Sequence, residues 1–172
     1  QQQMIDLNVA GLTAMLSAFV PAMVQRGAGR VLNVASIASF QPVPSLATYA
    51  ATKAYVLSLS ESLAEELRGT GVSCTSLCPG PVPTEWAEIA SAHEFSLRPA
   101  QVSPADVAAQ AVDGMQAGAR QVIPGAVVNV TMGPDRVVKT DTARADGRWS
   151  VAFADGTGDY LVHVAAPNRV AF

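Results

Sequence analysis

The stretch RVLNVASIAS, residues 30–39, decides the fold together with LATYAATKAYVLSLSESLAEELRGTGVSCTSL, residues 46–77. The first stretch opens with a β-branched run after a glycine, which is typical of a buried parallel strand. Residues 46–68 are rich in Ala, Leu, Ser and Glu and end at glycines, so they predict a long helix. Residues 72–77 predict the next strand. Short links in this order imply parallel strands joined by right-handed crossovers.

The same alternation of helix and strand extends on both sides of this stretch. Residues 4–25 place apolar side chains at helical spacing, and Pro21 is expected to kink the later turns. Residues 103–106 read Ser-Pro-Ala-Asp, an N-cap, a first-turn proline and an early acid, so a helix is predicted from there to about Ala117. Residues 122–123 predict one more short strand. The fold class expected is α/β, with a partial Rossmann-type parallel sheet covered by helices.

The pattern changes beyond Ala126. Period-two alternation predicts strands at residues 136–140, 148–153 and 160–164. Asp-Gly pairs at 146–147 and 155–156 predict hairpin turns between them. The change predicts two domains: residues 1–126 form a truncated α/β domain, and residues 127–172 form a small antiparallel β-rich tail.

Composition and charge exclude some classes of function. The net charge is −3 and the 11 Lys and Arg residues are scattered, so no basic stripe exists to bind a nucleic acid. Polar residues such as Gln25, Arg26, Glu61 and Glu65 interrupt the apolar runs, which argues against a membrane helix of ~20 residues. No secretory signal opens the chain. A cytoplasmic protein that binds neither membrane nor nucleic acid is expected.

The cysteines and histidines predict neither a disulfide nor a metal site. Cys74 and Cys78 are four residues apart in a predicted strand, so their Cα atoms lie ~13 Å apart, too far to bridge. Both are expected to be buried free thiols. With only His93 and His163 in the chain, a hydrolase triad or a histidine-rich metal site has little support.

Three side chains predict proton-transfer chemistry. Tyr49 and Lys53 are four residues apart in the long predicted helix and share one face. Ser36 ends the preceding strand, where open parallel sheets bind ligands. A phenol that acts as a base near neutrality needs its pKa lowered by roughly 3 units, worth ~4 kcal/mol, and a nearby ammonium acts in that direction. The Ser36 hydroxyl can donate to the oxygen on which charge develops.

Four motifs carry this chemistry in one order and register. They are Asp-Leu-Asn8-Val-Ala-Gly, Asn-Val-Ala-Ser36-Ile-Ala-Ser, Tyr49-Ala-Ala-Thr-Lys53 and Pro79-Gly80-Pro-Val82-Pro-Thr84. A lone Tyr-x-x-x-Lys is weakly specific, whereas four motifs in register are strongly specific. Together they resemble the short-chain dehydrogenases/reductases over about three-quarters of the chain.

The resemblance implies an oxidoreductase that interconverts a small-molecule alcohol and a carbonyl. Tyr49 is then the general acid/base, and Lys53 lowers its pKa and binds the nicotinamide ribose. Ser36 holds the substrate oxygen, and Asn8 keeps a water in the proton relay. Hydride passes between the substrate carbon and nicotinamide C4, and homo-oligomers form through the helix that contains Tyr49.

The resemblance also implies a cofactor, NAD or NADP. The residues that it assigns to cofactor binding are Tyr49, Lys53, Pro79, Gly80, Val82 and Thr84. Val82 and Thr84 are expected beside the nicotinamide carboxamide, and Pro79 and Gly80 turn the chain beneath the cofactor. The sequence does not reveal the choice between NAD and NADP.

The sequence departs from the family pattern in two places. The glycine-rich turn that receives the cofactor pyrophosphate is absent from the 172 residues, so we expect an open sheet edge at residues 30–35 and an inactive truncated fragment. The tail, through residues 140–153 and 158–167, resembles half of a carboxypeptidase regulatory-like or Cna-B-like β-sandwich. The alternative function is therefore a non-catalytic binding or structural protein, a chimeric fragment with an extracellular-type module.

Several further polar and aromatic residues stay without an assigned role. Ser39, Thr48 and Thr52 are interpreted as loop polarity and helix surface, although Ser39 can also shape the pocket. The residues that either line a substrate pocket or fill the core are Trp86, His93, Phe95 and Met115.

Overall fold

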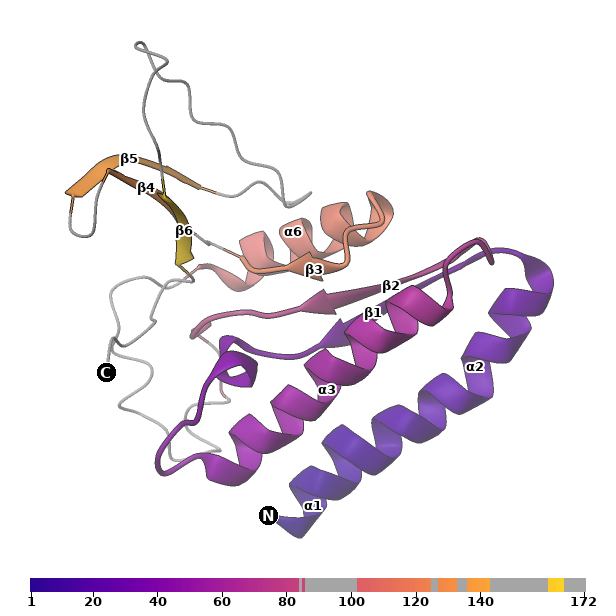
Figure 1. Ribbon diagram of the computed structural model, residues 1–172. Helices are drawn as coiled ribbons and strands as arrows, with labels where there is room; N and C mark the ends of the chain where they lie inside the picture. The colour runs from indigo at the N-terminus through magenta and orange to yellow at the C-terminus, as the bar shows by residue number, and fades with distance from the viewer. Residues whose placement is uncertain (84, 86–101, 125–126, 133–135, 143–160, 166–172) are drawn as a thin grey trace.

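The computed structural model describes residues 1–83, 85, 102–124, 127–132, 136–142 and 161–165 (Figure 1). Three parallel strands, β1 (Gly29–Val34), β2 (Val72–Leu77) and β3 (Gln121–Val122), form one sheet in the order β1-β2-β3. β1 pairs with β2 along its whole length, and β3 pairs with the last two residues of β2. The parallel α/β architecture expected from the sequence is confirmed.

Helices cover both faces of this sheet (Figure 1). The helical elements are α1 (Gln2–Ile5), the π-helix η1 (Asp6–Gly11), α2 (Leu12–Arg26), the 3₁₀ helix η2 (Ile37–Phe40), α3 (Ala47–Glu66) and α6 (Pro104–Gln116). α2 and α3 lie on one face, and α6 lies on the other. This three-layer arrangement buries the sheet on both sides, as parallel sheets require.

Alternation along β2 supplies both cores. Val72 and Cys74 pack with Leu67 and, from α2, with Val20 and Met23. Leu77 points to the opposite face, where it packs with residues of α6, namely Val107 and Ala111. A fully buried Val or Leu side chain contributes ~1.5–3 kcal/mol, so these contacts hold the layers together.

A buried polar contact joins β1 to α3. Asn33 is 4 % exposed, and its side-chain amide donates to the Ser60 hydroxyl at 2.9 Å. Ser60 in turn donates to the main-chain carbonyl of Val56 at 2.6 Å. An unsatisfied buried amide or hydroxyl costs ~1–3 kcal/mol, so these bonds favour one position of α3 over the strand.

The two turns that enter β1 and β2 touch each other. Gly27 and Gly71 both adopt positive φ, at 69° and 80°. A Cβ atom added to Gly71 would lie only 2.0 Å from the carbonyl oxygen of Gly27. Glycine is therefore required at position 71 both for its conformation and for the close approach of the two turns.

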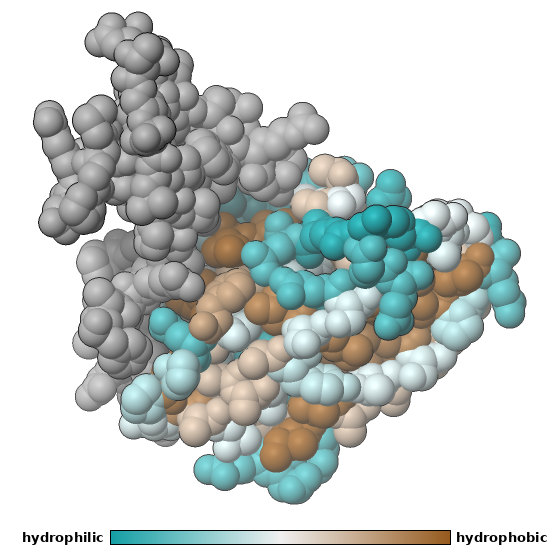
Figure 2. Space-filling view, viewed as in Figure 1, coloured by the Kyte–Doolittle hydropathy of each residue, from teal (hydrophilic) through white to brown (hydrophobic). Residues whose placement is uncertain are grey.

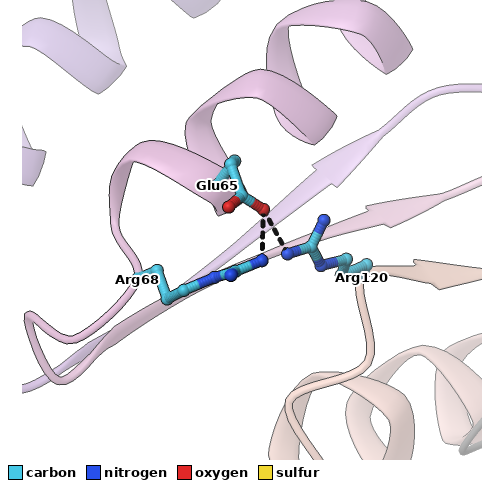
Figure 3. Close-up of polar contacts among 3 residues, drawn as sticks. All are labelled: Glu65, Arg68 and Arg120. Carbon is cyan, nitrogen blue, oxygen red and sulfur yellow. Dashed lines mark hydrogen bonds and ion pairs between the residues drawn. The ribbon is translucent and has the colours of Figure 1, made fainter.

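An exposed ion-pair cluster links the end of α3 to the start of β3. Arg68 and Arg120 both donate to the same carboxylate oxygen of Glu65, at 2.7 and 2.5 Å (Figure 3). The hydrogen bond from Arg120 is the largest of the interactions that hold the pKa of Glu65 below its usual value. Because the cluster is exposed, its contribution to stability is small and depends on salt.

The N-terminal helix bears on two expectations. Pro21 lies inside α2, which continues to Arg26, and a π-helical segment, η1, precedes it. The kink expected at Pro21 stays a prediction. The helix Gln2–Arg26 is also long and apolar enough to cross a membrane, since an 18-residue window within it has a mean hydropathy of 1.7. This finding differs from the expectation that polar residues interrupt the run. One such helix near the N-terminus is weak support for a membrane segment, because signal sequences pass the same test. Only 6 % of the apolar window is buried, so it is not a core helix.

β1 forms the edge of the parallel sheet. Within the described ranges it pairs with β2 alone, and Val34 near its carboxyl end is 52 % exposed. An apolar strand edge of this kind is open to pairing. The feature matches the open sheet edge expected from the sequence.

A second, antiparallel sheet has the order β5-β4-β6, formed by β4 (Val127–Met132), β5 (Arg136–Thr142) and β6 (Leu161–Ala165). β5 and β6 correspond to two of the predicted tail strands, whereas the sequence pattern did not predict β4. The strand predicted at 148–153 and both Asp-Gly turns lie outside the described residues. The division into two domains and the resemblance of the tail to a β-sandwich module stay predictions.

The contact between the turns gives a first prediction. Gly71→Ala is expected to lower the free energy of unfolding by roughly 3 kcal/mol or more, since the new methyl meets a main-chain oxygen. Gly69→Ala is the matched control, because Gly69 has φ 79° and open space around it. It is expected to cost only the left-handed strain, ~1 kcal/mol. Urea denaturation of both variants measures the difference, and equal losses would contradict the close approach.

The ion-pair cluster gives a second prediction. The folded-state pKa of Glu65 is lowered from 4.5, so its contribution to stability is present above pH 4.5 and is lost as pH falls through the lowered pKa. Glu65→Gln is expected to reduce the loss of stability on acidification below pH 4.5. Glu66→Gln, at the neighbouring exposed position, is the control. An unchanged acid response in Glu65→Gln would show that the cluster contributes nothing.

Candidate active site

The loops that follow β1 and β2 continue side by side beyond the strands. The amide of Ala35 donates to the carbonyl of Leu77 at 2.8 Å, and the amide of Ile37 donates to the carbonyl of Pro79 at 3.0 Å. Ser36 and the Pro79 segment therefore meet at the carboxyl edge of the sheet. Open parallel sheets bind their ligands at this edge.

Ser36 is held in an extended conformation at the start of η2. Its hydroxyl accepts from the amide of Ala38 at 3.1 Å, and its own amide donates to the Ser39 hydroxyl at 3.3 Å. This reciprocal pair is a capping box that begins the 3₁₀ helix. Ser36 is 8 % exposed, so its hydroxyl is set in a mostly buried position.

Tyr49 and Lys53 come to the same place from α3. The ammonium nitrogen of Lys53 lies 5.8 Å from the centre of the Tyr49 ring and donates to the carbonyl of Val34 at 2.8 Å. The Tyr49 side chain is hydrogen bonded to the side chain of Ser36. The structure thus brings together the three residues on which the predicted proton transfer depends.

Burial changes the acidity of both ionisable groups. Burial raises the pKa of Tyr49 above 10.0, and the hydrogen bond with Ser36 opposes this change only in part. Burial lowers the pKa of Lys53, and the nearby Cys78 acts in the opposite direction. The pKa of Tyr49 therefore departs from its usual value in the direction opposite to that expected from the sequence. The phenol is protonated near neutral pH.

Asn8 also contacts α3. No described hydrogen bond joins it directly to Ser36, Tyr49 or Lys53. It lies within η1, and its side-chain amide donates to the Thr52 hydroxyl at 3.1 Å. Thr52 in turn donates to the carbonyl of Tyr49 at 2.8 Å. A π-helical turn inside a longer helix is often found at functional sites. The role of Asn8 in holding a water stays a prediction.

The sequence did not predict the packing of two residues at the site, Thr52 and Ser39. Thr52, interpreted as helix surface, is 3 % exposed. The burial of Thr52, Val56 and Ser60 at a spacing of four marks the inner face of α3, and this period would have identified Thr52. Ser39 donates to the carbonyl of Lys53 at 2.8 Å, a contact that no sequence pattern indicates.

The remaining candidates fall into two groups. Met115 is half-buried on α6, and Thr48 is half-buried at the start of α3. Thr84, Trp86, His93 and Phe95 lie outside the described residues.

The residues after β2 lie beside Ser36, and their role at the nicotinamide end of a dinucleotide stays a prediction. Pro79, Gly80 and Val82 are half-buried and line the loop beside Ser36. Lys53 brings a half-buried cation with three donors to the same edge, which suits a ribose with its hydroxyl acceptors.

Both cysteines are buried free thiols, as predicted. Burial raises the pKa of Cys74 to about 11 and that of Cys78 to about 12. The charge of Glu61 adds to the rise at Cys78. Both sulfurs are therefore protonated near neutral pH and are poor nucleophiles.

Comparisons with known sequences identify the family of this chain. The family model for short chain dehydrogenases matches residues 1–94. An uncharacterised oxidoreductase of Staphylococcus epidermidis is 40% identical over 85 residues, which cover 49% of this chain and 37% of that protein. One from Myxococcus xanthus is 46% identical over 81 residues, 47% of this chain and 32% of that protein. The chain spans less than half the length of these relatives.

Solved structures show the same likeness in three dimensions. A short-chain dehydrogenase from Sphingobium yanoikuyae in complex with NADPH has a TM-score of 0.65 and 31% identity, over 70% of this chain and 46% of that one. A short chain dehydrogenase from Burkholderia cenocepacia in complex with NADP has a TM-score of 0.60 and 28% identity, over 70% and 49%. With more than half of its residues matched by the family model, this chain belongs to the short chain dehydrogenase family of oxidoreductases.

Proposed function

We propose that residues 1–124 supply the catalytic part of an NAD(P)-dependent oxidoreductase that interconverts a small-molecule alcohol and a carbonyl. The convergence of Ser36, Tyr49 and Lys53 at the carboxyl edge of a parallel sheet carries this proposal. The NADPH and NADP complexes of the two similar dehydrogenases support a nicotinamide cofactor. A cytoplasmic location is part of the proposal.

The geometry suits proton donation to a carbonyl oxygen. A phenol is protonated near neutral pH at its ordinary pKa of 10.0, and burial raises the pKa of Tyr49 further, so Tyr49 carries a proton that it can donate as a general acid. The Ser36 hydroxyl, fixed by the Ala38 amide, donates to the same oxygen as negative charge develops there. NAD(P)H, when bound, supplies the hydride. These roles favour carbonyl reduction as the direction for the first assays.

Lys53 and Asn8 act around the phenol rather than on the substrate. The Lys53 ammonium stabilises the phenolate that forms when Tyr49 gives up its proton, since opposite charges at this separation attract. Lys53 also holds the nicotinamide ribose, for which it brings three donors. Asn8, bonded to Thr52, keeps a water that returns a proton to Tyr49.

Removal of the phenol hydroxyl tests the proposal. Tyr49→Phe is expected to lower kcat for carbonyl reduction about 100-fold or more, because the general acid is lost. Tyr55→Phe is the matched control, since Tyr55 lies on the same helix and its hydroxyl pairs with Thr13 at 2.6 Å, outside the proposed site. It is expected to stay within about twofold of the parent.

The assay uses the protein expressed from the full reading frame that encodes these 172 residues. Absorbance at 340 nm follows NADPH and NADH oxidation over a panel of small aldehydes and ketones, and nicotinamide fluorescence measures cofactor binding. Absence of both saturable binding and turnover in the parent would contradict the oxidoreductase proposal. It would favour the non-catalytic binding or structural alternative.

We further propose that the chain self-associates through the uncovered face of its N-terminal helix. Leu7, Met15 and Phe19 are 74 %, 57 % and 55 % exposed. Hydrophobic side chains lie at the surface over this helix, at the lower edge of the molecule in Figure 2. Exposed apolar side chains grouped on one helix are typical of a surface that another protein or a membrane covers.

Light scattering tests self-association. The parent is expected to have at least twice the mass of one chain, and a Leu7→Ser, Phe19→Ser double variant is expected to have the mass of one chain. Val112→Ser is the control, because Val112 is 42 % exposed on α6. A parent with the mass of one chain, or one that sediments with lipid vesicles, would contradict the proposal.

A further inference from the structure

Ser39 joins two of the candidate site residues through one oxygen atom. Its hydroxyl donates to the main-chain carbonyl of Lys53 at 2.8 Å and accepts from the main-chain amide of Ser36 at 3.3 Å. Ser36 belongs to the loop after β1, whereas Lys53 lies in the first half of α3. The contact therefore spans 14 residues of chain and links the strand side of the site to the helix side.

The two bonds fix different properties of the site. The bond to Lys53 sets the separation between η2 and the turn of α3 that carries the ammonium. The bond from the Ser36 amide, with the return contact from the Ala38 amide to the Ser36 hydroxyl, sets the orientation of Ser36. Ser39 is half-buried, so water competes with these bonds less than it does at the surface.

We propose that Ser39 is a positioning residue: its hydroxyl holds the Ser36 hydroxyl at a fixed place relative to Tyr49 and Lys53. The consequence for catalysis rests on the proposed function, whereas the geometric coupling does not. A hydroxyl that donates to a developing negative charge must already point at it, because reorientation during the reaction reduces the stabilisation. Ser39 meets this need from outside the substrate site.

Loss of the Ser39 hydroxyl is expected to change kcat more than KM or cofactor affinity. In Ser39→Ala the Ser36 amide loses its acceptor, and the Ser36 side chain is free to turn away from Tyr49. The affected interaction is one that strengthens in the transition state, so kcat falls while KM and cofactor affinity change little. Ser39→Thr retains a hydroxyl and is expected to restore the behaviour of the parent.

Nuclear magnetic resonance of the chain tests the coupling without any assay of turnover. In Ser39→Ala, exchange of the Ser36 amide hydrogen is expected to accelerate about tenfold relative to the most protected amides. The ring signals of Tyr49, assigned by their loss in Tyr49→Phe, are expected to shift. Ser62→Ala is the control, because the Ser62 hydroxyl also donates to a main-chain carbonyl of α3, that of Ser58 at 2.9 Å, but on the exposed side.

Steady-state kinetics on the full reading frame test the consequence. Ser39→Ala is expected to lower kcat about tenfold with KM within twofold, and Ser39→Thr and Ser62→Ala are expected to match the parent. If Ser39→Ala does not fold, Ser39→Cys replaces it, since a thiol is a much weaker donor.

The outcomes separate the two proposals. An unchanged Ser36 exchange rate and unchanged Tyr49 signals in Ser39→Ala would overturn the positioning role, as would an unchanged kcat in an active parent. An inactive parent with the expected spectral changes would contradict only the oxidoreductase proposal.

Discussion

The parallel pairing of β1 and β2, with α3 crossing between them, is the constraint on which the rest of the structure depends. A parallel pair needs a connection that returns the chain to the same end of the sheet. The usual solution is a right-handed crossover that contains an α-helix. The return path places α3 across the strands and brings its first turns to the edge where Ser36 leaves β1. The candidate site is thus a product of the connection, and no separate element builds it.

Burial at this edge has two opposite effects on the chemistry. It excludes water and so strengthens hydrogen bonds and charge interactions, but it also disfavours the charged forms of Tyr49 and Lys53. Hydrogen bonds from Ser36 to the phenol and from Lys53 to the Val34 carbonyl partly compensate. The result is a neutral phenol, the proton donor, beside a lysine ammonium that is partly buried with it.

Much of the fold was accessible from sequence because its signals are local. β2 begins and ends where it was predicted, and β1 and α3 differ from their predicted bounds by one or two residues. The meeting of Ser36 with Tyr49 follows from strand direction and helical period, both readable in the residues. Membership of the family was also readable from motif order, and the comparisons confirm it.

The features that sequence reasoning missed depend on long-range packing. The burial of Thr52 and the bond from Ser39 to Lys53 follow from how η1 and η2 lie against α3, which no single segment determines. The π-helical turn in η1 has no distinctive composition. β4 escaped prediction because its pairing with β5 and β6, rather than its own alternation, makes it a strand.

The glycine contact between the two turns at the amino end of the sheet has a consequence for how this scaffold can vary. The carbonyl of Gly27 leaves no space for a side chain at position 71, so the second turn keeps its glycine as long as the two turns stay in contact. The other end of the sheet, where the loops after Ser36 and Pro79 leave the strands, is free of this contact. A lineage built on this scaffold can therefore diversify its chemistry by insertion while its base stays the same.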